Sequence, residues 1–330
     1  MDTGTHVVMG IGLYALTSVD PVVTTHAATD NALLFATIAA SVIPDIDTVL
    51  KAKDNATYIR NHRGATHSIP ATCLWPIVLT GVIQTFFPEA NLFHIWIWSF
   101  LGVFLHVFVD IFNAYGTQAL RPLTYKWIAL ESINIFDPLI FGLHIAGFVL
   151  WYLFAAPVVI FLTIYAILII YYIWRIIARR RAEHQVQSTI NGALNVHLSP
   201  TIHWTQYHMA AQSEDQYFVG ELNRGKLTII DTFDRKPIPE NDLFHLAEQD
   251  ENIAAFQSFS PIYRWEWAKK NNLHEIRFID LRYLTNNGKH YPFVAIAHIN
   301  EDHGVIASYT GWVYSEAKLQ KKLNQTAHQV

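Results

Sequence analysis

The sequence predicts an α-helical membrane domain of about six transmembrane helices, followed by a soluble α+β domain with a largely antiparallel sheet. Hydrophobic residues make up 52% of the 330 residues and charged residues only 15%, against about 25% charged in ordinary globular domains. Long apolar runs fill the first half, whereas the second half alternates apolar and polar residues between turn signals. We therefore expect a membrane-embedded helical domain over residues 1–177, a linker helix over 178–195 and a soluble α+β domain over 196–330.

Six apolar segments are the candidate membrane helices. Three approach the roughly 20 residues that a helix needs to cross a bilayer, and they cover about 69–87, 92–114 and 157–177. The shorter ones cover about 5–19, 32–44 and 136–153. No basic stretch precedes the first segment and no small-residue cleavage pattern follows it, so we expect it to stay in the mature protein.

Lysine and arginine residues predict the orientation, because short basic loops favour the cytoplasm. The loops near Asp30, Glu89 and Ala155 carry neither residue type. The basic residues of the connecting segments follow the second and fourth helices, and a further group ends the sixth: Lys51, Lys53, Arg60 and Arg63; Arg121 and Lys126; Arg175, Arg179, Arg180 and Arg181. We therefore expect an integral protein of the cell membrane with both termini and the C-terminal domain in the cytoplasm.

The second half has the pattern of a soluble domain. Its β-branched or alternating runs are interrupted by turn signals such as Asn286–Lys289. The clearest expected strands are Leu227–Thr232, Ile276–Leu281, Phe293–Ile299 and Val305–Val313. Short strands at this spacing favour a largely antiparallel sheet.

The distribution of charge along the chain excludes some classes of function. Residues 1–174 hold 10 acidic and 6 basic residues, whereas residues 175–330 hold 17 of each. The balanced second half argues against a nucleic-acid binder, which would show a basic excess. A carboxylate near hydrocarbon is costly unless it is paired or bound to a cation, so the acidic excess of the apolar half requires a reason. The single cysteine, Cys73, excludes an internal disulfide.

The polar residues of the apolar half gather at one predicted edge of the membrane. The expected helix ends place His6, Asp45, Asp47, His62, His67, His106, Asp110 and Asp137 on the cytoplasmic side. Polar residues scattered at random over six helices would not share one edge. This convergence predicts a site.

The residue types at this edge suit a cation and an anion. His106 and Asp110 are four residues apart on a helix, so both side chains can share a metal. Asp45 and Asp47 place two carboxylates at a helix end, where a cation can bridge them. Arg63 stands in a segment with two histidines before an apolar helix, whose N-terminal dipole favours anions.

Four motifs follow one another in residues 1–150: Asp2–His6, Pro44–Asp47, His62–Ser68, and His106–Asp110 running on to Thr117. Together they resemble the YdjM-like family of membrane-bound, metal-dependent hydrolases. The His/Asp set of that family is similar, more distantly, to the metal ligands of zinc-dependent phospholipase C and related single-strand nucleases. The resemblance implies that the metal ligands are His6, Asp45, His67, His106 and Asp110, with Asp110 as a bridge between two ions.

Two parts of the phospholipase C pattern have no expected counterpart here. The amino-terminal amine is not expected to bind metal, since the chain starts at Met1 and Asp2, and a later His-x-x-x-Glu pair has no clear match. One or two ions are therefore expected rather than three. Residues after about 180 resemble no family that we can name from sequence.

The predicted function is a metal-dependent hydrolase. A divalent ion, zinc before manganese or iron, would lower the pKa of a water molecule toward 7 and polarise a phosphoryl or acyl oxygen. Asp47 or His62 would accept the proton of that water, and Arg63 would hold an anionic group of the substrate. Because the expected site lies at the headgroup level of the cytoplasmic leaflet, a phospholipid or lipid-linked phosphoester is the expected substrate and membrane lipid the expected partner.

Three alternatives remain open on the sequence. In the first, the substrate would be a soluble phosphoester, and the C-terminal domain would control its access to the site. A cation or proton transporter would use the same histidines and aspartates, although transport requires polar groups deeper in the membrane. A sensor or scaffold without catalysis would use bound metal to order the membrane half and the C-terminal domain to recruit a protein.

Overall fold

A computed structural model describes residues 1–270, 272–285 and 290–326, and the turn expected at Asn286–Lys289 lies outside them. The chain divides into two compact units. The first, which we call the helical unit, comprises Met1–Asp47, His62–Arg181 and Pro200–Trp204. The second, the α/β unit, comprises Thr48–Asn61, Ala182–Ser199 and Thr205–Val330. The segment 48–61 therefore belongs to the α/β unit although the helical unit flanks it in sequence.

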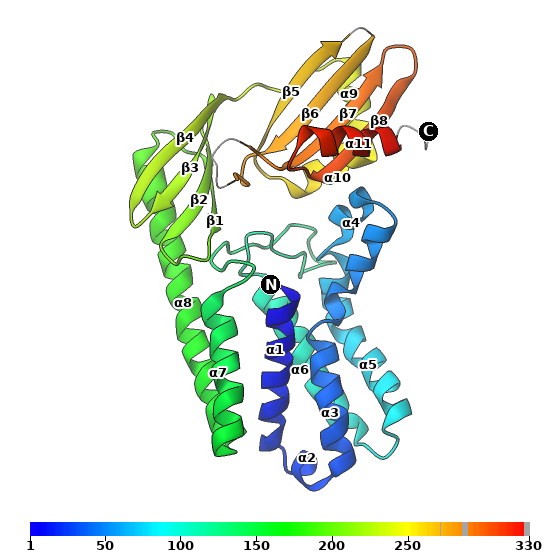
Figure 1. Ribbon diagram of the computed structural model, residues 1–330, viewed down its shortest axis with the longest axis vertical. Helices are drawn as coiled ribbons and strands as arrows, with labels where there is room; N and C mark the ends of the chain where they lie inside the picture. The colour runs from blue at the N-terminus through cyan, green and yellow to red at the C-terminus, as the bar shows by residue number, and fades with distance from the viewer. Residues whose placement is uncertain (271, 286–289, 327–330) are drawn as a thin grey trace. The chain divides into compact units, whose positions relative to one another are not determined.

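Apolar helices lie side by side in the helical unit (Figure 1). Their bounds are α1 (Thr3–Leu16), α3 (Ala27–Ala40), α5 (Ile69–Phe86), α6 (Leu92–Asp110), α7 (Pro138–Phe154) and α8 (Pro157–Thr189). Shorter turns connect them: η1 (Thr17–Val19), α2 (Pro21–Thr25), η2 (Ile43–Ala52) and η3 (Ala65–His67). The buried side chains of α1, α6, α7 and α8 form one apolar core that includes Met9, Val109, Ile140 and Phe161.

Polar residues at the helix starts fix where these helices begin. The side chains of Asp2, Ser68 and Asn91 accept hydrogen bonds from the first backbone amides of α1, α5 and α6. Asp137 caps α7 in the same way and also accepts from Tyr171 Oη at 2.6 Å. We expected Asp137 to join the convergent polar edge, but these bonds occupy its carboxylate in holding α7 and α8.

Among the described residues, three helices are long and apolar enough to cross a membrane: α5, α6 and α8. A fourth span results if α3 and η2, which meet at a bend of 49°, are taken as one. The expected six spans are not supported. α1 and α7 are apolar but shorter, with 14 and 17 residues, and therefore do not reach the length of the three candidate spans.

The α/β unit contains two four-stranded sheets with sequential strand order. The first consists of β1 (Asn195–Pro200), β2 (Gln206–Gln212), β3 (Gln216–Asn223) and β4 (Lys226–Asp234). The second consists of β5 (Tyr263–Lys270), β6 (Leu273–Asp280), β7 (Phe293–Asn300) and β8 (Gly304–Trp312), all paired antiparallel. The predicted antiparallel architecture is confirmed, and the four expected strands correspond to β4, β6, β7 and β8. The strands β1, β2, β3 and β5 were not among those expected. The sequence of the edge strand β5, YRWEWAKK, is rich in charge, as edge strands often are.

Helices pack on the second sheet. Apolar side chains of α9 (Asp242–Gln249) and α10 (Glu251–Phe259) form one core with those of β6 and β7, including Phe256, Phe278 and Phe293. The short helix α4 (Asn55–Asn61) adds Ile59 to this core, and α11 (Glu316–Thr326) adds Leu319 and Leu323 to a neighbouring one.

Gly10 provides a test of the helical packing. A Cβ atom at Gly10 of α1 would lie 2.9 Å from the carbonyl oxygen of Thr37 and 3.0 Å from Cα of Ile38, both on the backbone of α3. We expect Gly10→Ala to destabilise the protein by about 1–3 kcal/mol, because helix backbones cannot yield as a flexible side chain does. Thermal unfolding of the purified protein in detergent measures this change. Gly142→Ala on α7 is the matched control, since nothing lies within 4 Å of its Cβ position; an equal loss in both variants would contradict the close approach of α1 and α3.

Candidate metal centre

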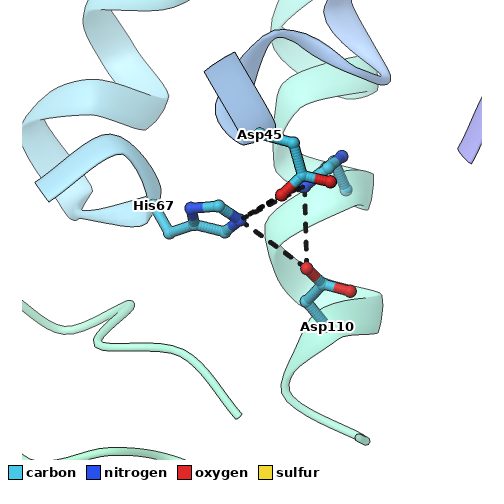
Figure 2. A group of neighbouring side chains, drawn as sticks. Asp45, His67 and Asp110 are labelled. Carbon is cyan, nitrogen blue, oxygen red and sulfur yellow. Dashed lines mark hydrogen bonds and ion pairs between the residues drawn. The ribbon is translucent and has the colours of Figure 1, made fainter. Parts of the chain in front are cut away.

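Four side chains of the helical unit bring their ligand atoms within 4.8 Å of one another: Asp45, His67, His106 and Asp110. We call them the four-residue cluster. Figure 2 shows Asp45, His67 and Asp110 pointing toward one another. The two histidine Nε2 atoms are 3.2 Å apart, and each lies 3.6 Å from Asp45 Oδ1 and 3.6 Å from Asp110 Oδ2. A tetrahedral zinc shell with bonds of 2.0–2.1 Å has edges of about 3.3–3.4 Å, so the spacing suits such an ion.

Three local structures position the cluster. Asp45 lies in η2, directly after the 49° bend that follows α3. His67 ends η3, and the next residue, Ser68, caps α5, so the imidazole stands at the start of that helix. His106 and Asp110 occupy the last turns of α6 at the expected four-residue spacing.

Hydrogen bonds fix the tautomers of both histidines. His106 Nδ1 donates to the carbonyl oxygen of Ser41 at 2.6 Å, since a carbonyl can only accept. Thr66 Oγ1 donates to Asp47 Oδ2 at 2.7 Å and therefore accepts from His67 Nδ1 at 3.0 Å. In the neutral rings both lone pairs then lie on Nε2. Two acceptors facing each other at 3.2 Å repel unless a cation or proton lies between them.

Burial adds to the cost of leaving this cluster without a cation. The side chains of His67, His106 and Asp110 are fully buried and that of Asp45 is 15% exposed. Asp45 Oδ1 and Asp110 Oδ2 have no hydrogen-bond partner among the described residues. Burial also holds the pKa of His67 well below its usual range, which favours the neutral form that a metal ligand requires. Buried, unsatisfied carboxylate oxygens are expensive, and a bound divalent ion would satisfy them.

The predicted ligand His6 lies outside the four-residue cluster but beside it. Its ring stacks on His106 at 3.7 Å between centroids, and its Nε2 is 3.3 Å from Asp110 Oδ1. The amino group of Met1, which we had left out of the site, also contacts Asp110 Oδ1, and Asn113 Nδ2 donates to the same oxygen at 3.2 Å. Asp110 Oδ1 therefore contacts Met1, His6 and Asn113, whereas Asp110 Oδ2 faces the two histidines of the four-residue cluster.

Asp47 and His62 form a hydrogen-bonded pair next to the cluster. His62 Nδ1 donates to Asp47 Oδ1 at 2.7 Å, and Asp47 Oδ2 accepts from the amide of Arg63 at 2.9 Å as well as from Thr66. Asp47 is 4% exposed, whereas the His62 side chain is 25% exposed. Asp45, Asp47 and His62 also lie within 4.8 Å by ligand atoms. Because three donors already occupy Asp47, we interpret the pair as an oriented imidazole rather than a second cation site.

Arg63 is buried in the same region. Its Nη2 lies 3.3 Å from Asp110 Oδ2 and 3.3 Å from the carbonyl oxygen of Met1. Its backbone has φ of +57°, a left-handed conformation that is unusual for arginine and costs of order 1–3 kcal/mol. Its carbonyl oxygen accepts from the amide of Gln118 at 2.9 Å. A guanidinium held at this point places one positive charge against the buried carboxylates.

All eight residues singled out from sequence as ligands or catalytic groups lie in this region. Four supporting groups were missed, namely Thr66, Asn113, the carbonyl of Ser41 and the amino group of Met1. Thr66 stands inside the His62–Ser68 motif, and Asn113 follows Asp110 by three residues, so both had a positional signal. Ser41 contributes a carbonyl oxygen, which no side-chain pattern reveals.

Comparisons with known proteins agree with this architecture. The family described as YdjM inner membrane protein matches residues 1–182. Two further families match the α/β unit, the YfhP middle domain over residues 191–233 and the YfhP C-terminal alpha/beta plait domain over residues 242–323. The chain is 51% identical over 324 residues to "Uncharacterized protein YfhP" of Bacillus subtilis (strain 168), which covers 98% of each chain. No solved structure matches it. With three or four candidate spans and this match over its helical region, the chain belongs to the YdjM family of inner membrane proteins.

Proposed function

We propose that the protein is a membrane-bound, metal-dependent hydrolase that cleaves an ester or phosphoester of a lipid or lipid-linked substrate at the cytoplasmic leaflet. The observation that carries the proposal is the pair of buried imidazole Nε2 atoms, 3.2 Å apart and flanked by two carboxylates. Two nitrogen and two oxygen ligands suit zinc best, with manganese or iron as alternatives. The position of His6 across Asp110 supports one or two ions.

A divalent ion held by the four-residue cluster would supply a water molecule of lowered pKa and polarise the oxygen of the scissile group. His62 accepts the proton in this mechanism. Its Nδ1–H is fixed on Asp47, which leaves the lone pair of the neutral ring on Nε2. Asp47 orients the ring and stabilises the imidazolium, because its own oxygens are already occupied by donors. Of the two bases expected from sequence, the contacts favour His62.

Arg63 is proposed to bind the anionic group of the substrate. Its guanidinium lies 3.3 Å from Asp110 Oδ2, so it stands beside a cluster residue. Charge-assisted hydrogen bonds from a guanidinium match the planar or tetrahedral oxygens of carboxylates and phosphates. A phosphoester would place its negative charge against Arg63 and the ion together.

The loop over residues 118–127 supports a lipid substrate. Leu123 is 80% exposed and Tyr125 62% exposed, and Arg121 and Lys126 lie in the same loop. The loop is attached to the site, because the amide of Gln118 donates to Arg63 and the carbonyl of Arg121 accepts from Ile69. Exposed apolar side chains together with aromatic and basic residues are typical of the headgroup region of a membrane.

A transporter is less well supported by this arrangement. His67 lies in the short turn η3 and Asp110 is the last residue of α6, whereas Asp45 is the third residue of η2, the bent segment that follows α3. Transport sites lie near the middle of the membrane, where broken helices expose backbone groups. Metal flux into proteoliposomes, without turnover of any ester, would favour transport instead.

The metal requirement is tested with a matched pair of histidine variants. We expect the purified protein to contain zinc or a similar divalent ion, and a chelator to abolish hydrolysis of lipid phosphoesters. His106→Gln should lose the metal and the activity, because it removes one of the four facing ligand atoms. Metal content per chain and turnover are measured together.

The control for that pair is His144→Gln on α7. His144 is also fully buried, but its Nδ1 contacts the carbonyl of Ile140 and it belongs to neither metal-ligand group. It should keep both metal and activity. Turnover that resists the chelator, or a His106→Gln protein with full activity, would rule out the proposed hydrolase.

The role of His62 is tested separately from metal binding. We expect His62→Gln to lower kcat by about 10²–10⁴-fold, the usual contribution of a general base, while the metal content stays the same. Asp47→Asn should lower kcat as well, because an amide orients the ring less well than a carboxylate. Loss of metal in proportion to loss of activity would instead identify His62 as a ligand.

The lipid substrate is tested in the loop over residues 118–127. We expect Leu123→Asp to reduce hydrolysis of a phosphoester lipid in vesicles and to leave hydrolysis of a soluble short-chain phosphoester unchanged, since only the lipid requires access from the membrane. Leu153→Asp, at the end of α7 and 62% exposed, controls for the introduced charge. An equal loss on both substrates in Leu123→Asp would show that the loop acts on the fold rather than on lipid access.

A further inference from the structure

The hydrogen bond between Asp47 and His62 joins the two residues that flank the segment 48–61. The two residues are in side-chain contact in the helical unit, and the segment between them, Thr48–Asn61, belongs to the α/β unit. The helix α4 forms the second half of that segment, and His62 is the residue that follows its end. The orientation of His62 is therefore set partly by how α4 is held.

α4 is held by the α/β unit. Asn55 Nδ2 donates to Tyr309 Oη and to the carbonyl oxygen of Thr310, each at 3.0 Å. Ile59 packs against the core formed by α10 and the second sheet, and Arg60 Nη2 donates to the carbonyl of Glu251 at 3.3 Å. Helices of seven residues are not stable alone in water. The helical form of α4 therefore depends on these contacts.

The backbone after α4 is under constraint. Arg63 adopts φ of +57°, and its amide donates to Asp47 at 2.9 Å. A non-glycine residue keeps such a conformation only where its surroundings enforce it. On one side this turn is held by Asp47, and on the other it continues into α4. Loosening α4 would release the turn that carries both His62 and Arg63.

We propose that α4, anchored by Asn55, positions the turn that carries His62 and thereby the His62–Asp47 pair. Asn55 is thus a positioning residue, and it acts through the continuous chain that runs from α4 into His62. A change in the contacts of Asn55 would alter the orientation of His62 and leave the metal ligands in place. The catalytic consequence rests on the proposed function, whereas the coupling itself does not.

Hydrogen–deuterium exchange of the full-length protein tests the coupling without any substrate. Asn55→Ala removes both hydrogen bonds to β8. We expect faster amide exchange in α4 and also over residues 62–66, by about tenfold, because the amide of Arg63 loses its protection when the turn opens. Metal content should not change. If the hydrolase function is correct, kcat should fall while KM stays the same.

A second variant, in β8, perturbs the same contact between Asn55 and β8. A Cβ atom at Gly311, where φ is +141°, would lie 2.8 Å from Asn55 Nδ2, so Gly311→Ala should displace Asn55 and give the same exchange pattern. Gly304→Ala is the matched control. It is also a β8 glycine with positive φ, but nothing lies within 4 Å of its Cβ position. Asn252→Ala, which removes a 2.8 Å bond from α10 to Ser308 of β8, is the second control.

The outcomes separate the two proposals. Faster exchange in α4 with unchanged exchange over residues 62–66 would overturn the coupling, and no change in α4 itself would overturn the assignment of Asn55 as its anchor. Equal effects in Gly304→Ala or Asn252→Ala would show a general loosening of the unit. If the coupling appears in exchange but no ester is hydrolysed, the inference stands and the hydrolase proposal fails.

Discussion

The Nε2 atoms of His67 and His106 face each other at 3.2 Å, each held as an acceptor by a hydrogen bond on the opposite ring nitrogen. Two carboxylate oxygens without hydrogen-bond partners among the described residues complete the group. Four electron-rich atoms in a buried space repel one another, and burial removes the water that would screen them. The acidic excess of the apolar half is tolerable here only if positive charge is supplied. Arg63 supplies one such charge at Asp110 Oδ2, the amino group of Met1 contacts Asp110 Oδ1, and the proposed cation would supply further positive charge between the four facing atoms.

The surrounding helices place the residues of the four-residue cluster close together. The bend between α3 and η2 places Asp45, and the end of α6 places His106 and Asp110 in register with it. Gly102 of α6 lets that helix approach α3, since a Cβ there would lie 2.8 Å from Ala40 Cβ. Small residues of this kind bring membrane helices together where side-chain packing must be close. The hydrogen bond from His106 Nδ1 to the carbonyl oxygen of Ser41 links α6 directly to the end of α3.

Much of the site could be predicted from the sequence, because its residues occur in short motifs with fixed spacing. The four-residue interval of His106 and Asp110 specifies one helix face, and His62 and His67 share a segment of seven residues. Long-range placement could not be predicted. Arg175 was assigned to a cytoplasmic basic cluster, yet it is 1% exposed and donates to the carbonyls of Ser132 and Trp204 within the helical unit. Charge counts do not reveal whether a charge is paired.

The fold was predictable to a similar degree. Apolar length and alternation gave the helical region, the α/β region and four strands, while α1 and α7 were overestimated because apolar composition does not set helix length. The membership of α4 in the α/β unit depends on contacts of Asn55 and Arg60 with residues more than 190 positions away, which no local pattern encodes.

X-ray absorption at the metal edge of the purified protein tests the central claim most directly. A cation held by His67, His106, Asp45 and Asp110 predicts a first shell of nitrogen and oxygen only, at about 2.0–2.1 Å for zinc, with the scattering pattern of two imidazoles. A shell without imidazole, or a protein that binds no divalent ion when zinc is offered, would contradict the account.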